Sequence, residues 1–271
     1  MPAKKDTDGS ALSQFAEELY AARTKRGLTR DELGVAIGYS GSQIGMIESM
    51  GRTPTIEFAR LCDRFFDTPQ TFERMHVRIR AEPLPEYFRP FVIHEAKATA
   101  LYTFELALIP GLLQTADYAR ALFKARMGIG DEEAERLLTA RLERQAILNQ
   151  PNPPMFWAVL DEGVLHRPVG GRETMRVQSE HLIEMAQRPN VMIQIVPATV
   201  GEYAGLDGAF VIAEFADRPS IVYLGTIMTG FTIERAEHVA EVKLSYETLR
   251  AEALSPAASL ALMKEIAQTW T

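Results

Sequence analysis

The sequence predicts an α+β protein with an N-terminal all-α domain followed by a larger α+β domain. Apolar residues recur at helical spacing through residues 10–80, whereas the rest of the chain adds β-branched and aromatic runs bounded by glycine, proline or aspartate. Pro83 and Pro85 separate the two parts, because proline cannot continue a helix. We therefore expect a flexible N-terminus at 1–9, an all-α domain at 10–80, a linker at 81–89 and an α+β domain at 90–271.

The all-α domain is expected to hold five helices. Thr29 with Glu32, and Ser40 with Gln43, have the spacing of capping boxes, in which two side chains satisfy the free amide groups of a helix start. Thr53 followed by Pro54 predicts the start of the fourth helix. The five helices are expected to begin at Ser10, Thr29, Ser40, Thr53 and Pro69.

The second part is expected to mix strands with helices. Strands are predicted at Thr99–Leu106, Met155–Leu160, Val191–Val196, Ala209–Phe215 and Ile221–Leu224. Helices are predicted at about 90–97, 115–127, 131–149 and 173–187, and two more follow residue 235. The apolar stripe Met263, Ile266 and Trp270 on the last helix either completes the local core or forms a dimer or partner surface.

Charge and cysteine content favour a cytoplasmic protein. The net charge is −7, but residues 1–80 carry 12 Lys and Arg against 11 Asp and Glu, so the acidic excess lies in residues 81–271. No stretch approaches the roughly 20 apolar residues of a membrane span. The single cysteine, Cys62, cannot form an internal disulfide, which fits a reducing compartment and a buried structural thiol.

Residues 31–48 have the spacing of a helix-turn-helix. Gly34 stands where the two helices would approach closest, and Gly38 permits the turn between them. The apolar contacts between the helices come from Leu33, Ile37, Ile44 and Ile47. This pattern resembles the XRE, or phage-repressor-like, family over about residues 12–78.

The resemblance implies where double-stranded DNA would bind. In that family the third helix enters the major groove and the start of the second helix meets the DNA backbone. Gln43 is the candidate for direct readout of adenine, although capping its own helix is the alternative role. Arg52 is a candidate phosphate contact or an ordinary solvated charge. The implied DNA-binding residues are Thr29, Arg30, Ser40, Ser42, Gln43, Met46 and Arg52.

Two features of the third helix depart from the family pattern. The family often has arginine or lysine near positions 46 and 49, where this chain has Met46 and Ser49. Gly41 and Gly45 each cost about 0.8–1 kcal/mol of helix propensity relative to alanine. These glycines suggest a helix that orders fully only on DNA.

Three passages of the second part resemble the C-terminal domain of WhiJ-type, antitoxin-like regulators of Streptomyces and related actinomycetes. They are Leu108–Ala119, Trp157–Arg167 and Arg188–Pro197. The resemblance implies a developmental or antibiotic-linked repressor that works with a small acidic partner protein encoded nearby. It covers about residues 84–267.

The second part offers no clear catalytic or metal site. Asp161, Glu162 and His166 follow a strand, but on a helix the first of them points roughly 100° away from the other two. Capping is the simpler role for the two acids. The histidines His94, His181 and His238 are too scattered to predict a zinc site. We expect no catalytic residue, no metal and no cofactor.

A ligand or partner site in the second part is a further hypothesis. The glycine-containing segment 197–208 resembles a mobile loop over a pocket, with Tyr203 within it. Trp157 and Tyr223 are candidates for the pocket wall, and a core position is the alternative for each.

Three functions are compatible with these sequence features. The first is a homodimeric repressor whose second domain transmits a partner or ligand signal to the DNA-binding helix. The second is an antitoxin-like module that sequesters a small neighbouring protein and regulates its own operon. The third, an enzyme with its own DNA-binding domain, lacks any nucleophile–base or metal signature.

Overall fold

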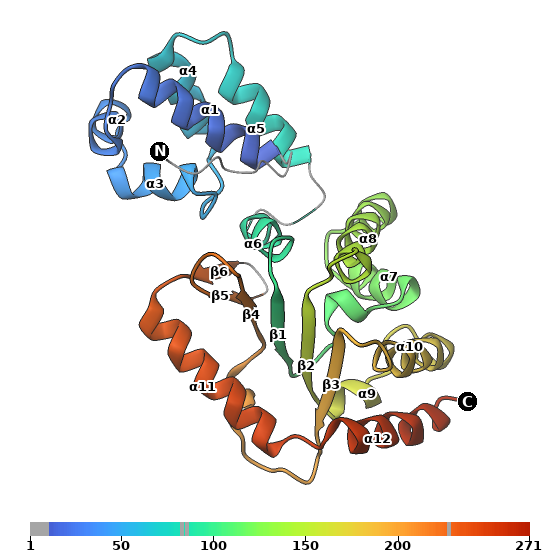
Figure 1. Cartoon of the computed structure of the whole chain (residues 1–271). Helices are drawn as coiled ribbons and strands as arrows, with labels where there is room; N and C mark the ends of the chain where they lie inside the picture. Colours follow the sequence, from blue (N-terminus) through green and yellow to red (C-terminus); the bar gives the residue numbers. More distant parts are fainter. Residues whose placement is uncertain (1–10, 82–83, 85–86, 227–228) are drawn as a thin grey trace. The chain divides into compact units, whose positions relative to one another are not determined.

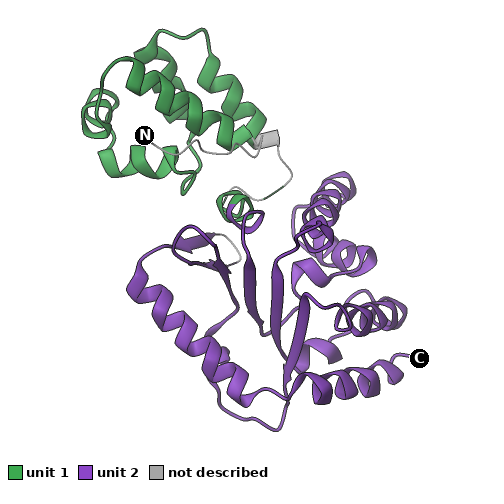
Figure 2. Ribbon diagram, in the orientation of Figure 1, with its two compact units in different colours: residues 1–93 green, residues 94–271 purple. Residues whose placement is uncertain are grey.

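The computed structural model describes residues 11–81, 84, 87–226 and 229–271, and its fold is α+β, as the sequence predicts (Figure 1). The chain divides into two compact units, Met1–Ile93 and His94–Thr271 (Figure 2). The expected flexible N-terminus at 1–9 lies outside the described residues, as do residues 82–83 and 85–86 of the expected linker.

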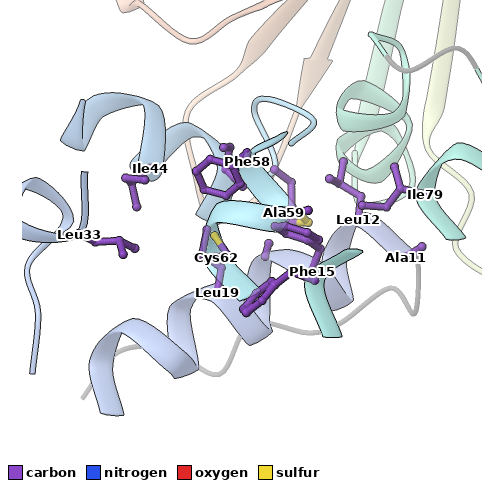
Figure 3. Packing of buried hydrophobic residues seen from close by; sticks show 14 of the residues in the cluster. Ala11, Leu12, Phe15, Leu19, Leu33, Ile44, Phe58, Ala59, Cys62 and Ile79 are labelled. Atoms are coloured by element: carbon purple, nitrogen blue, oxygen red, sulfur yellow. The ribbon is translucent and has the colours of Figure 1, made fainter. Parts of the chain in front are cut away.

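Unit 1 is a bundle of helices around one apolar core. Its helices are α1 (Ala11–Lys25), α2 (Arg30–Ile37), α3 (Gly41–Glu48), α4 (Ile56–Phe66) and α5 (Thr71–Ala81). A further short helix, α6 (Arg89–Glu95), spans the division between the units. The four apolar positions predicted for the helix-turn-helix are all buried in this core. Figure 3 shows Leu33 and Ile44 in the same cluster as Phe15 and Phe58.

Local capping defines α2 and α3 as the sequence predicts. Thr29 and Ser40 each form a complete capping box with the residue three positions later. Gly38 ends α2 in the left-handed conformation, with φ 78°, which a residue without a Cβ adopts at low cost.

The fourth helix starts later than the sequence predicts. Thr55, not Thr53, is its N-cap, and the Thr55 side chain accepts a hydrogen bond from the Phe58 amide at 3.1 Å. Pro54 therefore lies outside α4, where it is buried together with Thr53. The Thr-Pro-Thr sequence offers two candidate caps, and the register that buries Phe58 and Ala59 selects the second.

Unit 2 is built on a six-stranded mixed sheet with the order β3-β2-β1-β4-β5-β6. Strands β1, β2 and β3 are parallel, whereas β4, β5 and β6 pair antiparallel. The strands are β1 (Ala100–Glu105), β2 (Met155–Asp161), β3 (Val191–Val196), β4 (Phe210–Glu214), β5 (Ile221–Gly225) and β6 (Gly230–Ile233). The sequence did not predict β6, which is short and holds two residues of low apolar character, Gly230 and Thr232.

Helices cover both faces of the sheet. Val239, Tyr246 and Leu249 of α11 (Ala236–Glu252) pack over one face in a cluster with Phe104 and Ile212. Figure 1 shows the remaining α-helices of the unit on the other side of the sheet. They are α7 (Ala116–Lys124), α8 (Asp131–Gln145), α9 (Gly163–His166), α10 (Arg172–Met185) and α12 (Pro256–Gln268); the short 3-10 helices are η1 (Gly111–Leu113), η2 (Ala146–Asn149) and η3 (Ala204–Asp207).

The last helix completes the sheet edge. The amide of Leu254, which precedes α12, donates to the Ile195 carbonyl at 2.8 Å, and Ser259 Oγ accepts from the Ile195 amide at 2.9 Å, so both backbone groups of Ile195 at the free edge of β3 have partners. Met263 and Ile266 of α12 are buried. The apolar stripe of this helix therefore serves the core of unit 2.

Substitutions at two glycines of unit 1 test how closely α2 and α3 approach each other. A Cβ added at Gly34 would lie 2.6 Å from the Tyr39 carbonyl oxygen, which is backbone and cannot give way cheaply. A Cβ at Gly45 would meet only the flexible side chain of Arg30, at 3.5 Å. We expect Gly34→Ala to lower the free energy of unfolding by about 1–3 kcal/mol, and Gly45→Ala to raise it by up to about 1 kcal/mol.

Urea denaturation of the two variants and wild type provides the measurement. Equal destabilisation by both substitutions would contradict the close approach at Gly34.

Candidate nucleic-acid interface

The outer face of α3 carries the predicted base-contacting side chains. Ser40, Ser42 and Met46 are exposed, and Gln43 is half-buried. Met46 keeps 44% of its surface exposed although it is apolar. None of the eight residues of α3 is lysine or arginine. The face is therefore small, uncharged and partly apolar.

Gln43 takes part in the capping box of its own helix. The backbone amide of Ser40 donates to Gln43 Oε1 at 2.9 Å, and Ser40 Oγ accepts from the backbone amide of Gln43 at 3.2 Å. An adenine pair needs both the acceptor and the donor of the amide group. Gln43 must therefore share or release its capping bond when it contacts a base.

The start of α2 is more acidic than a phosphate site requires. Glu32 Oε2 accepts from the Thr29 amide at 2.7 Å and from Thr29 Oγ1 at 2.9 Å. These two bonds hold the pKa of Glu32 below its usual range, with the backbone bond contributing most. Since both donors of Thr29 already bind a carboxylate, Thr29 has little left to offer a phosphate.

A buried carboxylate beneath α3 joins three helices. Arg23 of α1 donates to Glu48 from Nε at 2.5 Å and from Nη2 at 3.1 Å. Arg30 of α2 donates from Nε to Glu48 Oε2 at 2.8 Å. The Glu48 side chain is 1% exposed and that of Arg30 53% exposed. Arg30 thus has its Nε fixed while about half of its side chain is exposed.

Arg52 lies directly after α3. Its backbone amide donates to the Met46 carbonyl at 3.2 Å, and its side chain is exposed. The two predicted backbone-contacting arginines are thus both close to α3, since Arg30 lies against Gly45 in the middle of that helix.

The structure does not bring the three candidate ligand residues of unit 2 together. Trp157 of β2 pairs with Tyr102 of β1. The pairing continues through β4 to Val222 of β5, so Trp157 and Val222 point to the same face of the sheet. Because neighbouring residues of a strand point to opposite faces, Tyr223 lies on the other face. Tyr203 donates to Asp161 Oδ2 at 2.6 Å on the Trp157 side. Trp157 and Tyr223 thus cannot line one pocket.

Several contacts hold the segment that contains Tyr203. Besides the bond to Asp161, the Ala198 amide donates to Glu162 Oε2 at 2.8 Å. Asp161 Oδ1 also accepts from the Gly163 amide at 2.7 Å, and His166 lies 3.2 Å from Glu162 Oε1. These acids serve local structure. No group of three metal-ligating side chains occurs among the described residues.

Two family models match the chain. The model described as "Domain of unknown function (DUF5753)" matches residues 88–265. The chain belongs to this family. A helix-turn-helix model matches residues 19–69, which include α2 and α3. Unit 1 is accordingly an XRE-type helix-turn-helix domain, and the chain is a DNA-binding regulator.

The DUF5753 region includes all six strands of the sheet and α7 to α11. No curated protein and no solved structure matches this DUF5753 chain. Within the part of the chain that the structure describes, every helix is too short or too polar to cross a membrane.

Glu48 is the residue of this site that the sequence interpretation missed. It follows Ile44 by four positions and adjoins Ile47, and this place beside the apolar stripe is the signal that could have identified it as facing the core. A carboxylate at such a position requires cationic partners, and Arg23 and Arg30 supply them.

Removal of this carboxylate should strongly destabilise unit 1. We expect Glu48→Ala to lower its free energy of unfolding by about 3–5 kcal/mol, because Arg23 is left buried without a counter-charge. Glu57→Ala removes an ion pair to Arg64 whose two side chains are 61% and 69% exposed, and it should change stability by less than about 1 kcal/mol.

Chemical denaturation followed by circular dichroism compares the two variants. A Glu48→Ala protein as stable as Glu57→Ala would show that the buried ion pairs contribute little.

Proposed function

We propose that this protein is a sequence-specific transcriptional regulator that binds double-stranded operator DNA and acts as a repressor in the cytoplasm. The observation that supports the proposal best is α3 itself, which presents Gln43 and the exposed Met46, with Arg30 against Gly45 and the Arg52 backbone bonded to the Met46 carbonyl. In the proposed complex α3 enters the major groove, and the two arginines contact phosphates on either side.

The chemistry of this face favours A·T base pairs. A glutamine amide pairs with N6 and N7 of adenine, and an apolar side chain contacts the methyl group of thymine. Guanine is usually recognised by arginine or lysine, and α3 has neither. The hydroxyl groups of Ser40 and Ser42 add contacts that tolerate several bases.

The weak charge of residues 1–80 supports a dimer. The first 80 residues carry 12 basic against 11 acidic side chains, so non-specific attraction to DNA is small. Two copies on a palindromic site would convert the second contact into an intramolecular one. We therefore propose a homodimer.

Unit 2 is proposed to sense a signal, either a small partner protein or a ligand. The resemblance of its three passages to WhiJ-type regulators of actinomycetes supports a small acidic partner encoded nearby. Trp157 and Tyr203 remain candidates for separate partner contacts on the α11 side of the sheet.

The role of Gln43 is tested by two substitutions. Gln43→Ala removes both the capping acceptor and the amide, whereas Gln43→Glu keeps an acceptor suited to the capping box but loses the donor to adenine N7. We expect both variants to lose about 1–3 kcal/mol of discrimination for the operator over random DNA. Only Gln43→Ala should also destabilise the helix. The measurement is titration of wild type and each variant onto the DNA upstream of the protein's own gene, across a series of salt concentrations.

Selectivity that survives in Gln43→Glu would assign Gln43 to capping alone. No preference of wild-type protein for any duplex would refute the regulator and would favour sequestration of a partner.

Met46 is tested through the thymine methyl group. Replacing thymines of the operator with deoxyuridine removes only that methyl, so we expect wild-type affinity to fall severalfold, about 0.8 kcal/mol for each buried methyl lost. Met46→Ala should respond less to the replacement. Ser49→Ala, an exposed position one turn further along the helix, serves as the control. An equal response of Met46→Ala and wild type would exclude contact with thymine.

A further inference from the structure

Amide side chains fix the segment between β1 and α7. Gln145 Nε2 donates to the backbone carbonyls of Gly111 and Gln114, at 2.9 and 2.7 Å. Gln178 is fully buried and donates from Nε2 to the Leu113 carbonyl at 2.7 Å. These bonds hold η1 in one conformation, so the side chains around it are presented in a defined geometry.

Two arginines lie over one aromatic ring beside η1. The guanidinium carbons of Arg126 and Arg141 are 5.3 and 5.1 Å from the centroid of Phe123. Arg141 Nη1 also donates to Gln114 Oε1 at 2.5 Å. A Cβ added at Gly111 would lie 2.8 Å from Arg141 Nη1, so this glycine lets the guanidinium approach the backbone of η1.

Positive charge exceeds negative charge at this cluster. A third arginine, Arg144, donates to Glu95 from Nε and Nη2 at 2.5 and 2.9 Å and is thereby neutralised. Neither Arg126 nor Arg141 forms an ion pair with any carboxylate of the residues that the structure describes. Glu105, at the end of β1, offsets only part of the excess, because burial raises its pKa to about 7.

The environment of Arg141 favours an anionic partner. Burial contributes most to lowering its pKa to about 9, and the charges of Arg144 and Arg126 lower it further, against the opposite effect of Glu95 and Glu105. A half-buried cation next to like charges gains stability when an anion joins it. The planar guanidinium presents parallel N–H donors that match the two oxygens of a carboxylate or a phosphate.

We propose that Arg126 and Arg141 bind the oxyanion group of a small molecule, a carboxylate or a phosphate, and that this is the effector site of unit 2. A polyanion such as DNA is disfavoured because residues 81–271 hold the acidic excess of the chain. This effector site adds to the proposed function. Oxyanion binding itself is independent of that function, and only the effect of the ligand on DNA binding rests on it.

Inorganic phosphate serves as the probe. Thermal unfolding of the full chain is followed by tryptophan fluorescence, which reports on unit 2 because Trp157 and Trp270 are its only tryptophans. Sodium chloride at equal ionic strength controls for screening. We expect phosphate to raise the Tm beyond chloride, with the concentration dependence of a binding equilibrium.

Three variants locate the phosphate effect. Arg126→Gln at an exposed position, and Arg141→Lys, which keeps the charge but loses the planar donors, should each weaken the apparent phosphate affinity about tenfold, or about 1.4 kcal/mol. Arg176→Gln removes another arginine of unit 2, one paired with Glu173 and Glu180 on α10, and should retain the wild-type response.

Two outcomes would overturn the proposal. One is a phosphate effect no larger than that of chloride, and the other is a wild-type phosphate response in both Arg126→Gln and Arg141→Lys. Since no DNA is present, either failure leaves the operator titrations as an independent test of the regulator.

Discussion

One buried carboxylate organises the DNA-binding unit. Glu48 ends α3, and its two oxygens accept from Arg23 of α1 and Arg30 of α2, so three helices meet at a single side chain. A charge in the core is tolerated only with such partners, and the partners in turn fix the angle between the helices. The same contact sets the position of Arg30 beside α3. The orientation of a surface arginine is thus decided in the interior.

Glycine lets α2 and α3 approach at the distance this arrangement needs. Gly34 contacts the backbone at Tyr39, and Gly38 makes the turn. Gly41 and Gly45 have a different role. Because neither has a Cβ, they leave room beside α3 for the side chains of Asp31 and Arg30. The complete capping box of α3 offsets part of the low intrinsic propensity of these glycines.

The sequence predicted most of the fold, since helical and strand periodicities are local signals. Where two solutions were locally equivalent, as for Thr53 and Thr55, tertiary burial decided. The four-residue strand β6 has too few apolar positions to show a period. Likewise, the separation of Trp157 from Tyr223 depends on register across four strands, which no single segment encodes. The role of Glu48 was missed because its partners lie 25 and 18 residues away.

The contacts of Leu254 and Ser259 with the edge of β3 have a consequence for the synthesis of the protein. Ile195 is bonded by Ser259, 64 residues later, so during synthesis the edge of the parallel sheet stays open while the intervening segment emerges from the ribosome. The helices of unit 1 depend on nearer contacts and can fold first. In a nascent chain the helices of unit 1 can therefore complete their contacts before Leu254 and Ser259 reach the edge of β3.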